Sequence, residues 1–219
     1  MAVHVLARRR HAVTGRFGLR PAPGGFATPM FGAGEVVRVS GGVLVHEQGG
    51  DARIDLLITL GRAADMVGVD LAAPFSTGAE SPAVADPDAP LAIDAGEARI
   101  LGAWWAQGAA AIDEVVGTTP TVAAVTTAQL WPEHFDLATT VTLAGGAQVN
   151  LGASPGDRVE PRPYLYVGPW DADRPGDAGY WNAPFGAVLR RADLADLPIH
   201  EARARVLDFL RRGLDLLAG

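Results

Sequence analysis

Acidic and imidazole side chains with a spacing that suits catalysis occur in the stretch LWPEHFDLA, where Glu133, His134 and Asp136 fall within four residues. In an extended chain alternate side chains point to the same side, so His134 and Asp136 would share a face and Glu133 would lie on the other. An H-x-D pair can ligate a metal, and a carboxylate can orient an imidazole for acid–base catalysis. A structural hydrogen-bonding role explains the same residues, so these roles stay open.

A catalytic metal at this place would need a third protein ligand. His46, in VHEQ, is the only candidate for it. We therefore predict no cofactor and no bound metal. Glu133, His134 and Asp136 are the catalytic candidates, with His134 as the general base, or as a ligand if a metal is used, in a hydrolysis or proton transfer.

A second stretch, GASPGD, matches the pattern G-x-S-x-G of the nucleophile elbow. The elbow requires a helix directly after the serine, whereas Ser154 is followed by a Pro-Gly turn and then by RVEPRPYLYVGPW. The prolines and β-formers of that segment predict a strand at a sheet edge, over 163–170. The only later histidine is His200, on an expected C-terminal helix. We therefore expect Ser154 in a β-turn and not as a nucleophile.

The hairpin LATTVTLAGGAQVNLG precedes this turn, and its apolar residues face one another only with a three-residue turn. That register sets Val141 opposite Val149 and Leu143 opposite Ala147, and it places Asn150 on the polar face. We expect a pocket in this β-region, although core packing explains its aromatic residues almost as well. The expected ligand contacts are Trp131, Asn150, Asp157, Tyr164, Tyr166 and Trp181.

The 219-residue chain has no cysteine and no lysine, so its 18 basic side chains are all arginine. The missing thiol excludes disulfides, cysteine nucleophiles and cysteine-based zinc sites. The missing amine excludes Schiff-base enzymes, P-loop nucleotidases and serine–lysine hydrolases. A net charge of −7 argues against nucleic acid as a partner. The short run Arg8, Arg9 and Arg10 does not change this balance, and we expect it in a solvated arm.

The arginines follow the apolar segment AVHVLA, which is the reverse of the order in a signal peptide. The most apolar long stretch, 98–116, carries Arg99, Asp113 and Glu114 and is too polar for a membrane span. We therefore expect an acidic cytoplasmic protein without a membrane partner. The oligomeric state is open.

The elements that position these residues follow from periodicity and turn residues. The first sixty residues predict β-structure, in which EVVRVSGGVLVHEQGGDARIDLLITL forms a three-stranded meander, closed by a short helix at 61–67. The Ala-, Pro- and Asp-rich segment 71–92 predicts a surface loop, either a linker or a lid. Asp94 and Glu97 predict the capped start of a central helix, with Trp104 in its buried stripe.

β-Structure is expected again over 129–189, followed by an amphipathic helix over 199–217. These elements predict an α+β fold, mainly antiparallel sheet packed on a central buried helix. We expect a single domain over 1–219, with a possible subdivision into 1–70 and 93–219.

The chain resembles a family of uncharacterised bacterial proteins. The similarity rests on LWPEHFDLA, NLGASPGD, PYLYVGPW and WNAPFGAVL, preceded by LGAWWAQGAAAIDEV. It covers roughly residues 95 to 215. The family has no assigned activity, so the resemblance implies only that these stretches belong to one unit and supplies no catalytic residue.

The sequence leaves two functions open. The first is a small-molecule binder or enzyme with an aromatic-lined pocket near His134. The second is a non-enzymatic interaction or assembly module that docks a partner on the expected edge strand 163–170. Aromatic residues around an enclosed cavity would favour the first, and an exposed flat patch the second.

Overall fold

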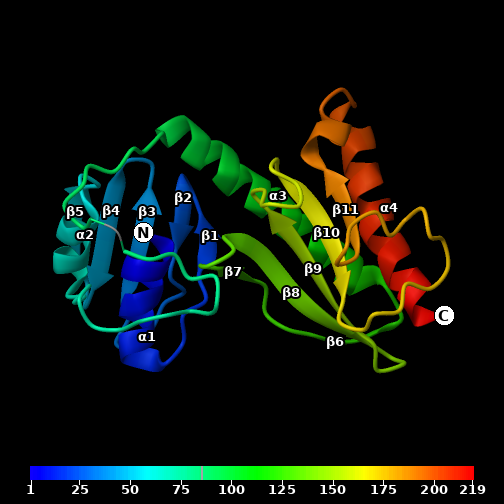
Figure 1. Cartoon of the computed structure of the whole chain (residues 1–219), viewed down its shortest axis with the longest axis horizontal. Coiled ribbons are helices and arrows are strands. Elements are labelled where there is room, and N and C mark those ends of the chain that lie inside the picture. Colours follow the sequence, from blue (N-terminus) through cyan, green and yellow to red (C-terminus); the bar gives the residue numbers. More distant parts are fainter. Residues whose placement is uncertain (85) are drawn as a thin grey trace. The chain divides into compact units, whose positions relative to one another are not determined.

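The computed structural model describes residues 1–84 and 86–219 and shows an α+β protein with two antiparallel sheets, as the sequence predicts (Figure 1). The chain forms two compact units. The first contains Met1–Ala103 and Gln129–Phe135, and the second contains Trp104–Ala128 and Asp136–Gly219. Within the described residues, no helix has both the length and the apolar composition needed to cross a membrane.

The sheet of the first unit is a meander in which each strand pairs with the next along the chain. Its strands are β1 (Arg20–Ala22), β2 (Gly25–Ala27), β3 (Val36–Ser40), β4 (Val43–Gln48) and β5 (Asp51–Leu56). Gly49 and Gly50 turn the chain between β4 and β5 with φ of +61° and +92°, the left-handed geometry of a tight hairpin. The predicted three-stranded meander is confirmed as β3, β4 and β5.

The N-terminal segment is helical, although the sequence predicts β-structure there. A π-helical segment, η1 (Ala2–Ala7), continues directly into α1 (Arg8–Thr14), which ends at Gly15 with φ of +70°. Figure 1 shows both segments lying across one face of the first sheet. The valines and leucine of AVHVLA suit either a strand or a buried helix, and packing of η1 on the sheet decides between them.

The prediction of a solvated arm at Arg8, Arg9 and Arg10 is wrong. A helix turns successive side chains by roughly 100°, so the three guanidinium groups point in different directions and each finds an acceptor. The acceptors are the carbonyl oxygens of Leu71, Ala73 and Gly18 and the carboxylate of Glu35.

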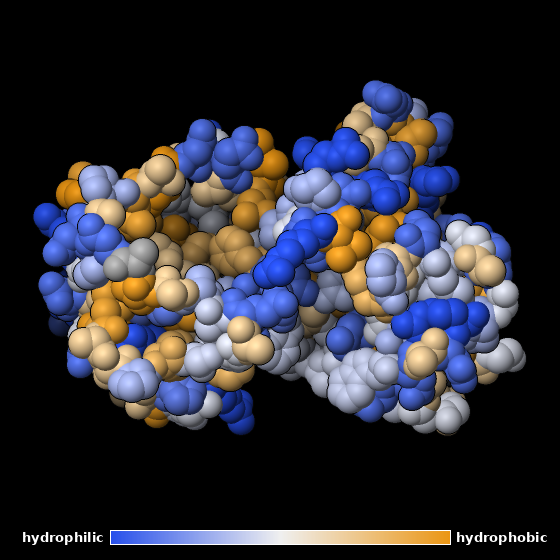
Figure 2. Space-filling view, in the orientation of Figure 1, coloured by the Kyte–Doolittle hydropathy of each residue, from blue (hydrophilic) through white to orange (hydrophobic). Residues whose placement is uncertain are grey.

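After β5, the predicted short helix is confirmed as α2 (Leu60–Val67). Strand β5 forms an edge of the first sheet, and Ile54 and Leu56 are 66% and 63% exposed on it. Figure 2 shows apolar residues at the surface on the side of the first unit where β5 lies. Charged residues alternate with these two along β5, which protects an exposed edge against pairing with other chains.

Segment 71–92, expected to join two parts of the domain, belongs to the first unit. After it, the long helix α3 (Ala95–Thr118) begins at the predicted cap. The side chain of Asp94 accepts hydrogen bonds from the amides of Gly96 (2.7 Å) and Glu97 (3.1 Å). These two bonds satisfy amides that have no partner within the helix.

In the second unit the strand order is β11-β10-β9-β8-β6. The strands of this order are β6 (Val122–Val125), β8 (Asp136–Leu143), β9 (Gln148–Ser154), β10 (Tyr164–Pro169) and β11 (Ala187–Arg190). The short strand β7 (Gln129–Trp131) belongs to the first unit. Beyond β11 follow the 3₁₀-helix η2 (Arg191–Leu194) and the C-terminal helix α4 (Ile199–Ala218).

The predicted register of the β8–β9 hairpin is confirmed. Val141 pairs with Val149, the amide of Leu143 donates to the carbonyl of Ala147, and Gly146 has φ of +88°. The apolar face of this hairpin packs on α3 and α4, which cover one side of the second sheet (Figure 1). The resulting core includes Ile112, Val115, Val141, Val149, Leu151, Val167, Leu210 and Leu214.

The expectation that strand 163–170 lies at a sheet edge is wrong, because β10 pairs with β9 on one side and with β11 on the other. Its prolines do not disturb the ladder. Pro161 and Pro163 precede the strand, and Pro169 lies beyond Val167, the last residue paired with β11. The missing proline N–H groups therefore remove no hydrogen bond between β10 and β11.

Candidate functional site

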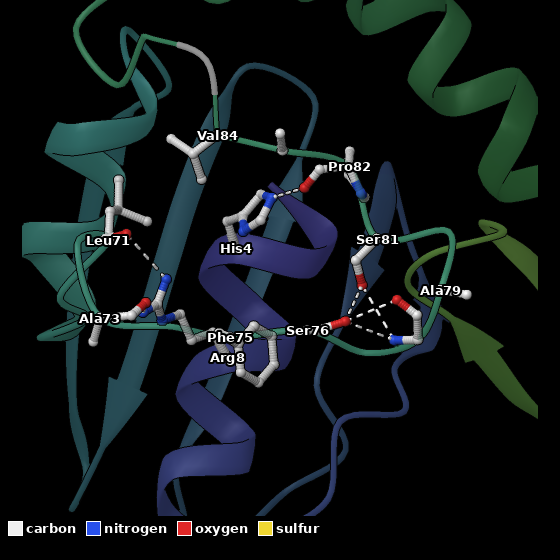
Figure 3. A pocket seen from close by; sticks show the side chains of 12 residues that line it. His4, Arg8, Leu71, Ala73, Phe75, Ser76, Ala79, Ser81, Pro82 and Val84 are labelled. Carbon is white, nitrogen blue, oxygen red and sulfur yellow. Dashed lines mark hydrogen bonds between the residues drawn. The ribbon is translucent and has the colours of Figure 1, made fainter.

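A pocket of about 400 Å³ lies in the first unit, between the N-terminal helical segment and the chain segment 71–84 (Figure 3). This volume is within the usual range of small-molecule sites. The pocket is lined by His4, Arg8, Leu71, Ala73, Phe75, Ser76, Gly78, Ala79, Ser81, Pro82, Ala83 and Val84. Part of the loop over 71–92, for which the sequence predicts either a linker or a lid, therefore forms one wall of a cavity.

His4 contributes a buried imidazole to this pocket, with only 8% of its surface exposed. Its Nε2 lies 2.6 Å from the carbonyl oxygen of Pro82, and because a carbonyl only accepts, Nε2 carries the proton. Burial lowers the pKa of His4 below its ordinary value. The imidazole is therefore neutral at pH 7, and Nδ1 presents a lone pair.

The Nδ1 atom of His4 is buried and has no hydrogen-bond partner within the described part of the chain. Figure 3 shows this nitrogen turned away from Pro82. Buried polar atoms are nearly always hydrogen-bonded, and leaving one without a partner costs about 1–3 kcal/mol. The imidazole that carries this atom lines the pocket.

Arg8 stands one helical turn after His4 and places its guanidinium on the same pocket. It is buried, and it donates to the carbonyl oxygens of Leu71 (3.4 Å) and Ala73. The guanidinium carbon lies 5.5 Å from the ring centroid of Phe75, which is cation–π geometry. Arg8 and His4 thus both bind main-chain oxygens of the segment 71–84.

The far end of the segment is held by its own side chains. The Ser81 hydroxyl oxygen accepts from the amides of Thr77 (2.8 Å) and Gly78 (3.2 Å), and the Ser76 hydroxyl donates to the Gly78 carbonyl (2.8 Å). Hydroxyl-to-backbone bonds of this kind fix a local turn. The wall of the pocket is therefore preformed.

His134 and Glu133 lie against this same segment. The Nδ1 of His134 is 3.3 Å from a carboxylate oxygen of Glu80, and both side chains are more than half exposed. Glu133 lies close to Gly78, since a β-carbon built there would be 3.5 Å from Glu133 Oε1. The other oxygen of Glu133 is buried without a hydrogen-bond partner among the described residues.

His134 and Asp136 do not share one face, because the chain is not extended between them. Residues 132–135 form a turn in which the amide of Phe135 donates to the carbonyl of Trp131 (2.7 Å). Phe135 has φ of +56°, an uncommon conformation for a bulky residue, and its ring packs edge-on against Phe26 at 5.0 Å. Asp136 starts β8 and belongs to the second unit.

A cluster of tyrosines and carboxylates occupies the second sheet on the face opposite the α3–α4 core. The Tyr166 hydroxyl donates to Asp136, and the Tyr164 hydroxyl donates to Asp157 at 2.6 Å. Burial, followed by the charge of Asp136, raises the pKa of Tyr166 well above its ordinary value. Four of the predicted site residues therefore meet here in two hydrogen-bonded pairs.

The expectation of a β-turn that contains Ser154 is wrong, because Ser154 is the last residue of β9 and the chain only bends at Pro155. Gly156 follows with φ of +115°, and the next regular element is the strand β10, not the helix that a nucleophile elbow requires. Ser154 is buried, and its hydroxyl oxygen accepts from the Gly156 amide (3.1 Å). Asp157 accepts from the amides of Val159 (2.7 Å) and Glu160 (3.0 Å). Ser154 and Asp157 thus stabilise this bend.

The other predicted contacts lie apart from this cluster or at its margin. Asn150 Oδ1 accepts from the indole of exposed Trp170 (3.0 Å) on the outer face. Trp181 packs edge-on against Tyr180 at 4.8 Å, beside the core next to α4. Trp131 belongs to the first unit, where it meets Phe17 at 6.0 Å. Trp131 is therefore in a different unit from Tyr164 and Tyr166, and Trp181 packs beside the core of the second unit.

A buried charge network lies under α1. Glu35 is 2% exposed and accepts two hydrogen bonds from Arg9 (2.7 and 2.9 Å) and one from His46 Nε2 (2.8 Å). Arg53 donates to His46 Nδ1 at 2.7 Å. Both nitrogens of His46 are thus engaged, and in the described ranges no three His, Cys, Asp or Glu side chains are grouped to hold a metal.

His4 and Arg8 are not among the site residues predicted from the sequence. The available signal is their spacing, because residues four apart share one face if AVHVLARRR is helical. In the β-structure predicted for this segment, a spacing of four residues has no such meaning, so His4 and Arg8 are not recognised as a pair. Comparisons of the chain with protein-family models, with curated proteins and with solved structures find no match.

Proposed function

We propose that the protein binds a small molecule in the pocket between η1–α1 and the segment 71–84. The observation that carries this proposal is the buried Nδ1 of His4, an acceptor that has no partner in the described chain and belongs to a side chain that lines a cavity of ligand size. A ligand that donates a hydrogen bond to this atom would recover the cost of burying it unpaired.

The remaining geometry supports binding at this place. Arg8 and His4 hold the segment through its carbonyl oxygens, and the hydroxyl network around Ser81 fixes its turn. A preformed wall lowers the entropy that a ligand loses on binding. In this proposal His134 contacts Glu80 on the outside of the segment and helps to keep it closed, and it does not act as a general base.

The alternative function, docking of a partner on strand 163–170, has less support. β10 is paired on both sides, so it has no free edge to which another strand can add. The tyrosine hydroxyls on its outer face already donate to Asp136 and Asp157.

The proposal is tested by blocking the pocket. Val84 lines it, and Val84→Trp would fill a large part of its volume. Val125→Trp is the matched control, because Val125 is half exposed on β6 in the second unit. A thermal-shift screen of organic acids, sugars, amino acids and nucleosides is run on the wild type and on both variants.

We expect the screen to find compounds that raise the melting temperature of the wild type and of Val125→Trp. The same compounds should not change the melting temperature of Val84→Trp. Circular dichroism of the unliganded variants checks that each is folded. If no compound gives a shift that Val84→Trp removes, the proposal fails.

A further inference from the structure

The charge and the hydrogen-bonding groups of the pocket also define a class of ligand. This inference rests on the proposed function and deepens it. We infer that the ligand is a small organic acid with a single carboxylate and with a hydroxyl or N–H donor close to it.

The charge of the pocket selects an anion. Among the described residues that line it, Arg8 is the only charged side chain, and none is a carboxylate. A guanidinium has five N–H donors, and the bonds to Leu71 and Ala73 use two of them. Arg8 therefore keeps donors for a carboxylate, with which guanidinium groups make their strongest hydrogen bonds.

The charge of the ligand is also limited, because Arg8 is the one charged side chain among the described residues that line the pocket. One carboxylate matches Arg8, whereas a phosphate dianion would leave one negative charge buried without a counter-charge, which is costly. The other basic side chains next to Arg8 in the sequence are engaged elsewhere: Arg9 pairs with Glu35, and Arg10 donates to Gly18. The pocket thus fits a monovalent anion.

His4 adds a requirement for a donor. Its Nε2–H is used by Pro82, so only the Nδ1 lone pair remains, and it can accept from a hydroxyl or an N–H but not bind a second oxygen anion. His4 and Arg8 are four residues apart on one helical face, roughly 6 Å between β-carbons. A donor on the carbon next to the carboxylate would therefore reach Nδ1 while the carboxylate meets Arg8.

The rest of the lining is apolar and accommodates a hydrophobic group on the ligand. Leu71, Phe75 and Val84 are the larger apolar side chains, and Phe75 is held in place by Arg8 and by an edge contact with His11 at 5.3 Å. An aryl or branched alkyl substituent on the acid would bury its surface against them.

Three probe compounds separate the parts of this inference. Mandelate carries a phenyl group, a carboxylate and an adjacent hydroxyl; phenylacetate lacks the hydroxyl; mandelamide lacks the charge. Binding to the wild type is measured by isothermal titration calorimetry. We expect mandelate to bind most tightly, phenylacetate about 2- to 10-fold more weakly and mandelamide about 10- to 100-fold more weakly.

Two substitutions of His4 separate its two nitrogens. The terminal amide of His4→Gln can keep the bond to Pro82 but leaves the Nδ1 position empty, whereas His4→Asn keeps an acceptor near Nδ1 and gives up the bond to Pro82. We expect His4→Gln to bind mandelate and phenylacetate equally, and His4→Asn to keep the preference for mandelate. A merely structural role of His4 would affect both ligands alike.

Arg8→Gln tests the charge. It keeps N–H donors for the carbonyls of the segment, and we expect it to weaken the binding of mandelate about 10- to 100-fold and that of mandelamide by a much smaller factor. The inference is overturned if mandelamide binds the wild type as tightly as mandelate, or if phenylacetate does. A further result would overturn the inference but leave the proposed function intact: only neutral or cationic compounds raise the melting temperature of the wild type, and Val84→Trp removes that increase. If Val84→Trp removes no ligand-induced increase in melting temperature, both the inference and the proposed function fail.

Discussion

The ring of Tyr166 lies directly over Gly152, its partner across β9 and β10: a β-carbon on Gly152 would be 2.4 Å from Cζ of the tyrosine ring. Gly152 also pairs with Ala138 of β8, so two small residues leave room for the ring on this face. The ring covers Gly152, and its hydroxyl reaches Asp136. The glycine is therefore required for the Tyr166–Asp136 hydrogen bond.

Gly152→Ala tests this relationship. The new methyl group would push the Tyr166 ring away and weaken its bond to Asp136, and we expect a loss of about 1–3 kcal/mol in the free energy of unfolding. Urea denaturation measures it. Gly145→Ala is the control, because nothing lies within 4 Å of a β-carbon there, and it should change stability by less than about 0.5 kcal/mol. Equal effects of the two substitutions would contradict the prediction.

The three tyrosines of the chain give a second prediction, since burial raises the pKa of Tyr164, Tyr166 and Tyr180 well above the ordinary value. The unfolded chain releases these protons near pH 10, while the folded chain keeps them. Stability from these groups is therefore complete below about pH 10 and is lost as the pH rises above it.

We expect no tyrosinate absorbance from the folded protein as the pH passes 10, and then a joint ionisation of all three tyrosines as the chain unfolds. A spectrophotometric titration followed in parallel by circular dichroism measures this. A tyrosine that ionised near pH 10 before any loss of structure would show that its burial is not maintained in solution.

Local patterns predict a large part of this fold. The β8–β9 register follows from alternation along the hairpin, because a slip by one residue would move its apolar side chains to the other face. The cap at Asp94 and the strand that follows GASPGD depend on residues next to one another, so the sequence suffices for them.

The features that sequence reasoning misses depend on distant contacts. His4 and Pro82 are 78 residues apart, and no local pattern links them. Phe135 adopts φ of +56° within a tight turn, a conformation that local preference disfavours for a bulky residue, so the extended geometry expected for His134 and Asp136 does not form. The pocket lies at the N-terminal helix, and none of the site residues predicted from the sequence is among the described residues that line it.

A third prediction concerns Glu35. Burial raises the pKa of its carboxyl group, but the hydrogen bonds from Arg9 and His46 and the charge of Arg9 together lower the pKa by more than burial raises it, so the net pKa lies below the ordinary value. A carboxylate of this kind stabilises the fold above its unfolded pKa, and that stability is lost as the pH falls through the folded pKa. The network should therefore weaken in acid, below about pH 4.5.

Glu35→Gln removes this dependence. It should lower the free energy of unfolding at pH 7 by about 3 kcal/mol, because Arg9 loses its buried counter-charge. The difference from the wild type should shrink as the pH falls through the lowered pKa of Glu35, because both chains are neutral at this position once Glu35 is protonated. Urea denaturation at several pH values measures both effects, and a difference that stays constant with pH would contradict the assigned role. Glu47→Gln, in the exposed pair with Arg38, is the matched control and should cost less than about 1 kcal/mol.

The last prediction is the tautomer of His46. Arg53 lies 2.7 Å from His46 Nδ1, and a guanidinium can only donate, so Nδ1 must be the acceptor and the proton must be on Nε2, where Glu35 accepts it. Long-range ¹H–¹⁵N NMR spectra distinguish the two nitrogens. We expect a single, fixed Nε2–H form for His46 and averaged signals for exposed His200. Arg53→Leu should free Nδ1 and leave the bond to Glu35 in place. A protonated Nδ1 in the wild type would show that Arg53 does not bind His46 in solution.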